Sequence, residues 1–193
     1  MPALPTDSQR TAWEQQQAQA RQRVHAGGGR AGVATMEQLA GKSGRQILEA
    51  MMSGELPYPH MAETLGFDLI EVGDGRAVFQ GVPHRGYYNP MGTVHGGWYA
   101  TLLDSALGCA VHSRLPAGRA YTTAELSINI VRAATHKSGP MRAIGNVVHS
   151  GRQMATAEAR ILDADGKLYA HATTTCFVFD ALALPARDAP TPP

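Results

Sequence analysis

Cysteine is scarce in this sequence, and its charges nearly cancel. Two cysteines among 193 residues are too few for a disulfide framework, which favours a reducing compartment. Both of them, Cys109 and Cys176, stand in apolar runs, so we predict buried free thiols. Lysine and arginine total 17 against 16 aspartates and glutamates, and this balance gives no indication of a nucleic-acid partner.

Long apolar runs are also missing. No segment approaches the length of a membrane span, and the first 30 residues contain no apolar stretch resembling a signal peptide. We therefore expect a cytoplasmic protein without a membrane partner. The histidines His84, His112, His136 and His149 are scattered without the spacing of metal ligands, so we expect no metal.

The length fits one domain flanked by two tails. Residues 1–34 open with prolines and continue into a Gln/Ala/Arg run that favours helix but has almost no apolar face. We expect a flexible N-terminal tail there, or a loosely docked helix. Residues 182–193 contain four prolines and are expected to be a disordered C-terminal tail, which leaves residues 35–181 as the domain.

The domain combines strands with two helices. Apolar residues at helical spacing predict one helix over residues 35–53, and a second, almost wholly apolar helix is expected over 94–112. Short apolar or alternating segments predict six strands, at residues 65–72, 76–82, 121–132, 141–148, 154–162 and 168–179. Glycine-containing turns at 73–75 and 163–166 indicate hairpins, hence an antiparallel sheet and an α+β fold.

The helix predicted at 94–112 contains one carboxylate, Asp104. Its other residues are apolar or small on nearly every side, which is typical of a helix enclosed by protein. Burying an unpaired, ionised carboxylate is costly, so Asp104 is either paired or chemically active. A hydrogen-bonded anchor at a subunit contact and a catalytic acid remain equally good interpretations on residue chemistry alone.

The entry to this helix is rich in glycine, with the sequence Asn-Pro-Met-Gly-Thr-Val-His-Gly-Gly over residues 89–97. The first turn of a helix presents unpaired N–H groups and a partial positive charge, so it can hold an oxyanion. Gly96 and Gly97 would let a substrate carbonyl approach the backbone, although a tight turn also explains them. His95 is expected to orient Asn89 or its loop.

Together, the Asn89–Gly97 motif, Asp104 and the strand that contains Thr122 and Thr123 resemble the PaaI-like hotdog-fold acyl-CoA thioesterases, over roughly residues 45–180. The resemblance implies a hotdog fold, in which an antiparallel sheet wraps a long central helix. The helix predicted over residues 35–53 is an added N-terminal helix of this fold. It also implies a homodimer or homotetramer and an acyl-CoA substrate. No cofactor is expected beyond the coenzyme A of the substrate.

The resemblance also implies roles for individual residues. The Gly96 N–H would polarise the thioester carbonyl, with Asn89 assisting and His95 bracing it. Asp104 would activate water or attack directly. Thr123 would hold that water, with Thr122 as its rival. The residues expected to bind substrate are Gly97, Arg132 and Arg152, with Lys137 as a further candidate for the coenzyme A phosphates.

Helix geometry adds a constraint to these roles. Eight residues on one helix span about 12 Å, so Gly96 and Asp104 of one chain cannot both reach one thioester. We therefore expect Asp104 to come from the partner subunit. The predicted function is hydrolysis of aryl- or medium-chain acyl-CoA. The alternative is a non-catalytic acyl-CoA binding or sensing module, which would keep the glycines but would not need Asp104.

Overall fold

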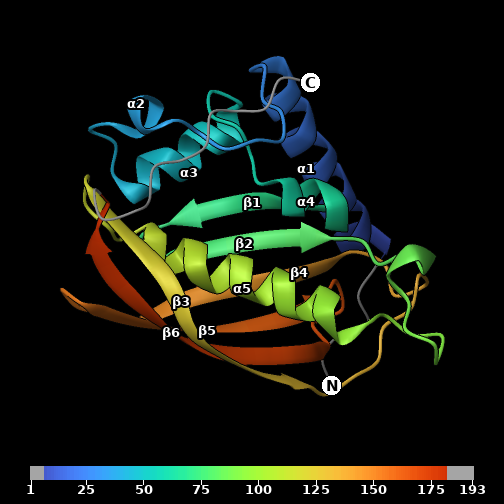
Figure 1. Ribbon diagram of the computed structural model, residues 1–193. Coiled ribbons are helices and arrows are strands. Elements are labelled where there is room, and N and C mark those ends of the chain that lie inside the picture. Colours follow the sequence, from blue (N-terminus) through green and yellow to red (C-terminus); the bar gives the residue numbers. More distant parts are fainter. Residues whose placement is uncertain (1–6, 182–193) are drawn as a thin grey trace.

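A six-stranded antiparallel sheet forms the body of the protein, and the computed structural model describes residues 7–181 of it. The strands are β1 (Phe67–Gly73), β2 (Arg76–Gly81), β3 (Arg119–Ile130), β4 (Met141–Ser150), β5 (Met154–Asp163) and β6 (Leu168–Asp180). Their order across the sheet is β1-β2-β4-β5-β6-β3. The sheet curves around helix α5 (Gly96–His112), as Figure 1 shows, so the expected hotdog fold is confirmed.

Helix α5 lies at the centre of the hydrophobic core. Its buried residues, which face the strands, are Trp98, Tyr99, Leu102, Leu103, Ala106, Leu107, Gly108, Ala110 and Val111. The indole N–H of Trp98 donates to the carbonyl of Leu65, and the Tyr99 hydroxyl donates to the carbonyl of Arg132. Both polar tips are therefore satisfied inside the core, as buried aromatic residues require.

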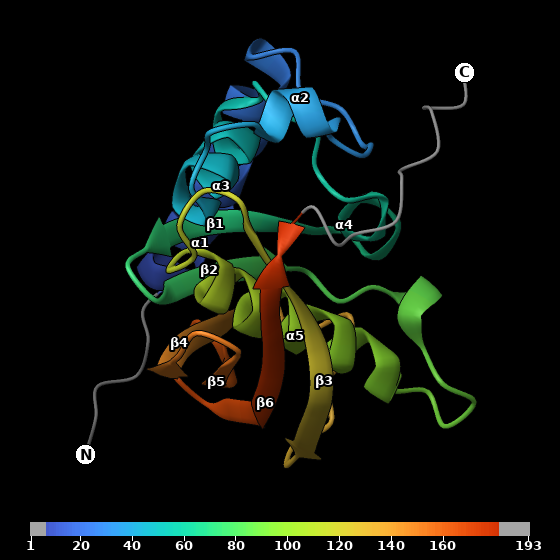
Figure 2. The same ribbon diagram turned by 60° about the vertical axis from the view of Figure 1, so that its left-hand side comes forward.

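The segment before the sheet folds into four helices, α1 (Asp7–Ala26), α2 (Met36–Leu39), α3 (Gly44–Ser53) and α4 (His60–Leu65). The single helix predicted over 35–53 is thus interrupted. Thr35 and Ser43 each accept a backbone N–H as N-caps, and Gly41 between them has a φ of +73°. The helix α4 was not predicted. Figure 2 shows these helices stacked beyond the β1 edge of the sheet.

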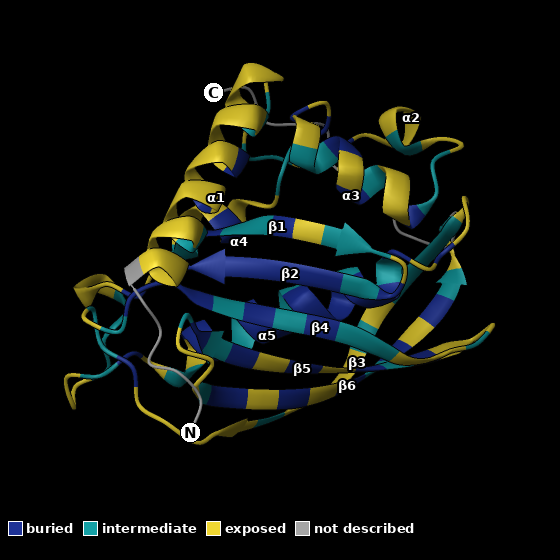
Figure 3. Ribbon diagram, turned by 180° about the vertical axis from the view of Figure 1, so that it is seen from behind, coloured by how far each residue is buried: buried dark blue, intermediate teal, exposed yellow. Residues whose placement is uncertain are grey.

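Of the two expectations for the N-terminal segment, a flexible tail or a loosely docked helix, the structure has the helix: α1 docks on the outer face of β1 and β2 (Figure 3). The docking is polar: the Gln17 amide donates to Asp68 at 2.6 Å and to the carbonyl of Gln80 at 3.1 Å. Gln80 is 0% exposed and donates to Gln17 and to the carbonyl of Trp13, each at 3.0 Å. Since these contacts need no apolar face, the hydrophobic pattern of residues 7–26 did not reveal them.

Residues 1–6 and the predicted C-terminal tail at 182–193 lie outside the described residues. Within the described range, no helix combines the length and apolar character needed to cross a membrane.

We predict that Gln17→Ala lowers the free energy of unfolding by about 1–3 kcal/mol, because it removes two hydrogen bonds of the buried Gln80, one to its backbone carbonyl and one from its side-chain amide. Urea denaturation followed by circular dichroism measures this. Gln19→Ala is the matched control, since Gln19 is exposed on the same helix. Equal stability of the two variants would contradict the docking role of Gln17.

Candidate active site

The loop before α5 is held together by the side chain of Asn89. Its Oδ1 accepts the backbone N–H groups of Met91, at 2.9 Å, and Thr93, at 3.2 Å, while its Nδ2 donates to the Thr93 hydroxyl at 3.0 Å. The amide has two N–H bonds, and only one of them donates within the described part of the chain. Asn89 therefore fixes the loop and retains a donor for a ligand.

His95 is the N-cap of α5. Its Nδ1 accepts the backbone N–H of Gly97 at 2.9 Å, and its own backbone N–H donates to the carbonyl of Tyr87. The expected bracing of Asn89 by the His95 side chain does not occur among the described contacts. His95 instead sets where the helix begins, because the cap satisfies one of the first-turn N–H groups.

The backbone N–H of Gly96 differs from its neighbours. Gly97 donates to His95 and Trp98 donates to the His95 carbonyl, but the Gly96 N–H has no acceptor among the described residues. It points from the positive end of a 17-residue helix. A Cβ at Gly96 would lie 3.3 Å from Cδ1 of Ile130, so the end of β3 lies directly beside this group.

Asp104 lies midway along α5, and Thr123 of β3 donates to its Oδ1 at 3.0 Å. Thr122, the alternative at the sequence level, is exposed. The reason is a β-bulge between Thr123 and Glu125 in the pairing of β3 with β6. A bulge adds one residue and reverses the alternation of sides. Before the bulge, the odd-numbered Thr123 faces the helix. After the bulge, the residues that face the helix are the even-numbered Leu126 and Ile128.

Asp104 is half-buried. The helix is therefore open along one side, and the expectation that protein encloses it on nearly every side is wrong for that side. The uncovered stripe of α5 runs along Gly97, Thr101, Asp104 and Ser105, which are exposed or intermediate. The sheet covers the remaining sides of the helix, and β3 flanks this one. The single chain thus presents Asp104 at an open face.

The two arginines expected to bind substrate lie at opposite ends of β3. Arg132 follows the end of the strand, and its guanidinium carbon is 5.8 Å from the centre of the Tyr169 ring. Arg152 lies in the β4–β5 turn, and its carbonyl accepts from Arg119 at the start of β3. One chain therefore cannot bring both side chains to one phosphate. Lys137 is exposed in the loop after β3.

Three further titratable side chains at α5, those of Cys109, His112 and Cys176, are neutral near pH 7. Cys109 and Cys176 are free, as predicted, and burial followed by the charge of Asp104 raises the pKa of Cys109 to about 12. Burial lowers the pKa of His112 to about 4, and its buried Nδ1 has no hydrogen-bond partner among the described residues. In the same part of the chain, no group of three or more histidines, cysteines or acids is arranged to hold a metal ion.

Comparison with known proteins agrees with this architecture. Residues 91–170 match the family model described as the thioesterase superfamily. The crystal structure of a phenylacetic acid degradation-related protein from Ralstonia eutropha JMP134 is 30% identical, with a TM-score of 0.62, over 67% of this chain and 98% of that one. The chain belongs to the thioesterase superfamily. It is a thioester hydrolase of the PaaI-like hotdog type.

Two further relatives fit this thioesterase assignment. The PaaI protein of the Escherichia coli phenylacetic acid degradation operon is 25% identical, with a TM-score of 0.57, over 62% of this chain and 84% of that chain. The 1,4-dihydroxy-2-naphthoyl-CoA hydrolase of Listeria monocytogenes is 25% identical over 108 residues, which are 56% of this chain and 86% of the hydrolase.

We predict that His112 makes this thioesterase acid-sensitive. An unfolded chain protonates His112 near its ordinary pKa of 6.5, whereas the folded chain does so only near 4. The unfolded state therefore binds more protons between these values, and the contribution of neutral His112, complete above pH 6.5, is lost as the pH falls toward 4. His112→Phe should reduce the loss of unfolding free energy between pH 7 and 4.5 by roughly 1–3 kcal/mol.

Urea titrations of both proteins at the two pH values measure the difference. His149→Phe is the control, because His149 is exposed. An identical pH dependence of wild type and His112→Phe would refute the prediction.

Proposed function

We propose that this protein hydrolyses acyl-CoA thioesters of aryl or medium-chain acids at a site shared between two copies of the chain. One observation carries the shared site. The unpaired Gly96 N–H and the Thr123-bound Asp104 belong to one continuous helix, about 12 Å apart along its axis. An oxyanion donor and a nucleophilic group must each come within about 3 Å of the reacting carbon or oxygen.

In the electrophilic half of the site, the Gly96 N–H donates to the thioester oxygen. A donor with no other acceptor is already oriented for the negative charge that develops there, and the helix dipole adds to its effect. The second N–H bond of Asn89 assists. Gly97 contributes by lacking a side chain, since its own N–H already donates to His95.

In the acid half, Asp104 of the partner subunit acts on water. Thr123 donates to Oδ1, which leaves Oδ2 to take the proton of a water molecule as its oxygen attacks the carbonyl carbon. The C–S bond then breaks, and the thiolate of coenzyme A leaves and is protonated. In the variant of this step where Asp104 attacks directly, a mixed anhydride forms first and water hydrolyses it.

A two-fold dimer through β3 would join the halves. None of the 12 residues of β3 is fully buried, and β3 is an edge strand that pairs with β6 alone. Ile130 adjoins Gly96, and Thr123 adjoins Asp104. An antiparallel pairing with its axis between Leu126 and Ser127 would set Ile130 opposite Thr123 of the partner subunit.

The same pairing would also bring together basic groups that one chain keeps apart. Arg132 follows the end of β3, while Arg152 contacts its beginning, so antiparallel strands would place Arg132 of one subunit near Arg152 of the partner subunit. Such a pair suits the phosphates of coenzyme A. An aryl acyl group is further supported by the relative whose substrate is a naphthoyl-CoA.

We predict that Asp104→Asn lowers kcat at least roughly a hundredfold while coenzyme A binding persists, because the amide removes only the charge that activates the nucleophile. Release of free thiol from a panel of aryl- and acyl-CoA esters measures the rate, and calorimetry measures the binding. Turnover within a few-fold of wild type would exclude Asp104 as the group that activates the nucleophile.

A second prediction concerns the neighbouring hydroxyl. Thr123→Val should lower kcat roughly tenfold or more, since it removes the hydrogen bond that orients Asp104. Thr122→Val is the matched control, one residue away and exposed. Equal effects of the two substitutions on kcat would exclude an orienting role for Thr123.

The shared site is tested by mixing two damaged chains. Asn89→Ala and Asp104→Asn are each expected to be nearly inactive. In a random mixture about half the dimers are mixed, and each of these holds one intact site, so roughly a quarter of wild-type activity returns. Mass spectrometry must show the mixed dimers, and mixed dimers no more active than their parents would rule out the shared site.

A further inference from the structure

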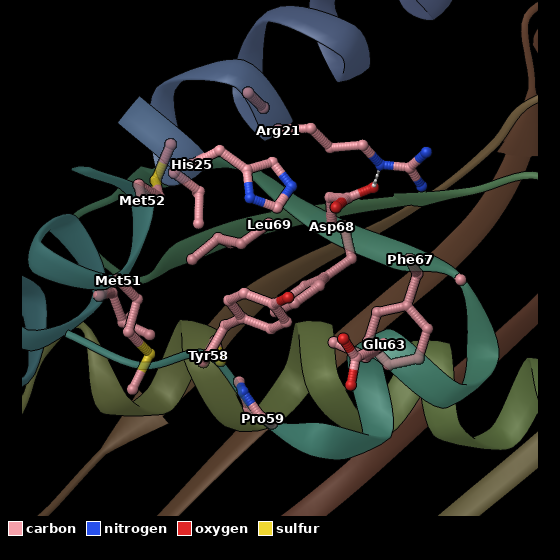
Figure 4. Close-up of a pocket in the computed structure, with 17 residues that line it drawn as sticks. Arg21, His25, Met51, Met52, Tyr58, Pro59, Glu63, Phe67, Asp68 and Leu69 are labelled. Atoms are coloured by element: carbon pink, nitrogen blue, oxygen red, sulfur yellow. Dashed lines mark hydrogen bonds and ion pairs between the residues drawn. The ribbon is translucent and has the colours of Figure 1, made fainter. Parts of the chain in front are cut away.

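A cavity of about 340 Å³ lies at the β1 edge of the sheet, apart from the residues proposed to act on the thioester. Figure 4 shows it between α1, α3 and the segment that leads into α4, with β1 beneath them. Cys109 of α5 lines it as well. The cavity therefore extends from the N-terminal helices down to the central helix of the fold.

The interior of the cavity is apolar. Leu48, Met51 and Met52 come from α3, and Phe67 and Leu69 come from β1. Methionine side chains are flexible and adapt to irregular apolar ligands. The volume is at the lower end of the range for small-molecule pockets, so it fits a short hydrocarbon segment.

Charged side chains at the cavity pair with one another. Arg21 and Asp68 form an ion pair at 2.8 Å, drawn as the dashed line in Figure 4. Burial, and then the charge of Glu63, raise the pKa of Tyr58, so its hydroxyl stays neutral. Among the described residues, the basic side chains that line the cavity are Arg21, which is paired with Asp68, and His25, so the cavity is unsuited to the phosphates of coenzyme A.

Cys109 connects the cavity to the proposed catalytic acid. It follows Asp104 by five residues on α5, about 8 Å along the helix axis. The charge of Asp104 contributes to the raised pKa of Cys109, in agreement with this proximity. Because its thiol stays protonated, Cys109 presents a small, neutral surface at the end of the cavity nearest Asp104.

Apart from Cys109, the residues that line the cavity precede the part of the chain that the family model matches. The family model begins at residue 91, whereas α1, α3, α4 and β1 all precede it. The relative from Ralstonia eutropha is covered over 98% of its length by only 67% of this chain. This chain therefore carries additional residues, and a cavity walled before residue 91 can differ between relatives that share a catalytic helix.

We propose that this cavity receives the distal part of the acyl group and makes the enzyme favour medium-chain aliphatic acyl-CoAs over short-chain ones. This inference rests on the proposed function, because it places the thioester at Asp104 and directs the chain past Cys109 toward Met52 and Leu69. A propionyl group is too short to follow that path. A decanoyl group is long enough to exchange water for the apolar walls.

Met52→Trp tests the assignment by filling the cavity. The measured quantity is the ratio of kcat/KM for decanoyl-CoA to that for propionyl-CoA, and we expect Met52→Trp to lower it roughly tenfold, the size of effect that hydrophobic pockets exert on chain length. Met61→Trp is the matched control: Met61 is on α4, is 53% exposed and does not line the cavity. It should leave the ratio within about twofold.

Leu69→Ala is the opposite change, and it keeps the test informative if Met52→Trp does not fold. By enlarging the cavity it should raise the ratio of dodecanoyl-CoA to octanoyl-CoA hydrolysis several-fold. Ratios that stay at the wild-type value in both folded variants overturn the assignment. Failure of the proposed function would look different, because Asp104→Asn would then retain activity on every chain length.

Discussion

The packing of α5 against the curved sheet is the constraint on which the rest of this structure depends. The sheet can cover most of a helix but not all of it, so the sequence of α5 is apolar on the covered sides and polar along one uncovered stripe. Asp104 lies on that stripe, and Gly96 is the first residue of the helix. The helix is rigid, so the 12 Å between these two groups cannot be shortened within one chain.

Much of this arrangement can be predicted from the sequence, because the most regular apolar patterns occur in the helix and strands that form the buried core. Strands alternate with period two, the central helix is apolar over 17 residues, and a lone carboxylate within it is conspicuous. The glycine-rich entry to α5 likewise indicates an anion-binding helix start. These features predict an antiparallel α+β fold and single out Asp104 and Gly96 as candidates, whereas the hotdog fold itself is implied by the resemblance to a known family.

Other features could not be predicted, for two physical reasons. Helix α1 docks through glutamine amides and an arginine, and hydrogen bonds between distant residues leave no periodic apolar signal. The bulge in β3 depends on its register with β6, a non-local property, so the choice between Thr122 and Thr123 stayed open. The role of His95 could not be predicted either. A histidine can cap the helix or hold Asn89 in place, and the residue type alone does not distinguish these two roles.

Two of the N-terminal helices pack on the sheet in different ways, α1 through polar contacts and α3 through apolar ones. Helix α1 covers the outer face of β1 and β2 with polar contacts, and these give it a fixed position. Helix α3 turns apolar residues toward the β1 edge, where they cover backbone that would otherwise be open to unwanted strand pairing. An edge strand on one side of the sheet is thereby closed, while β3 on the other side stays open.

The bulge in β3 divides the strand into two stretches with opposite alternation. Before it, odd-numbered residues such as Tyr121 and Thr123 face α5, and after it the inward residues are Leu126 and Ile128. Deleting Ala124 would merge the two stretches into one continuous alternation. Either the apolar residues or the threonine would then have to turn outward. Because Leu126 and Ile128 pack against the core, the threonine is the side chain that would turn outward. A single backbone residue thus lets β3 turn both its apolar residues and Thr123, which donates to Asp104, toward the same helix.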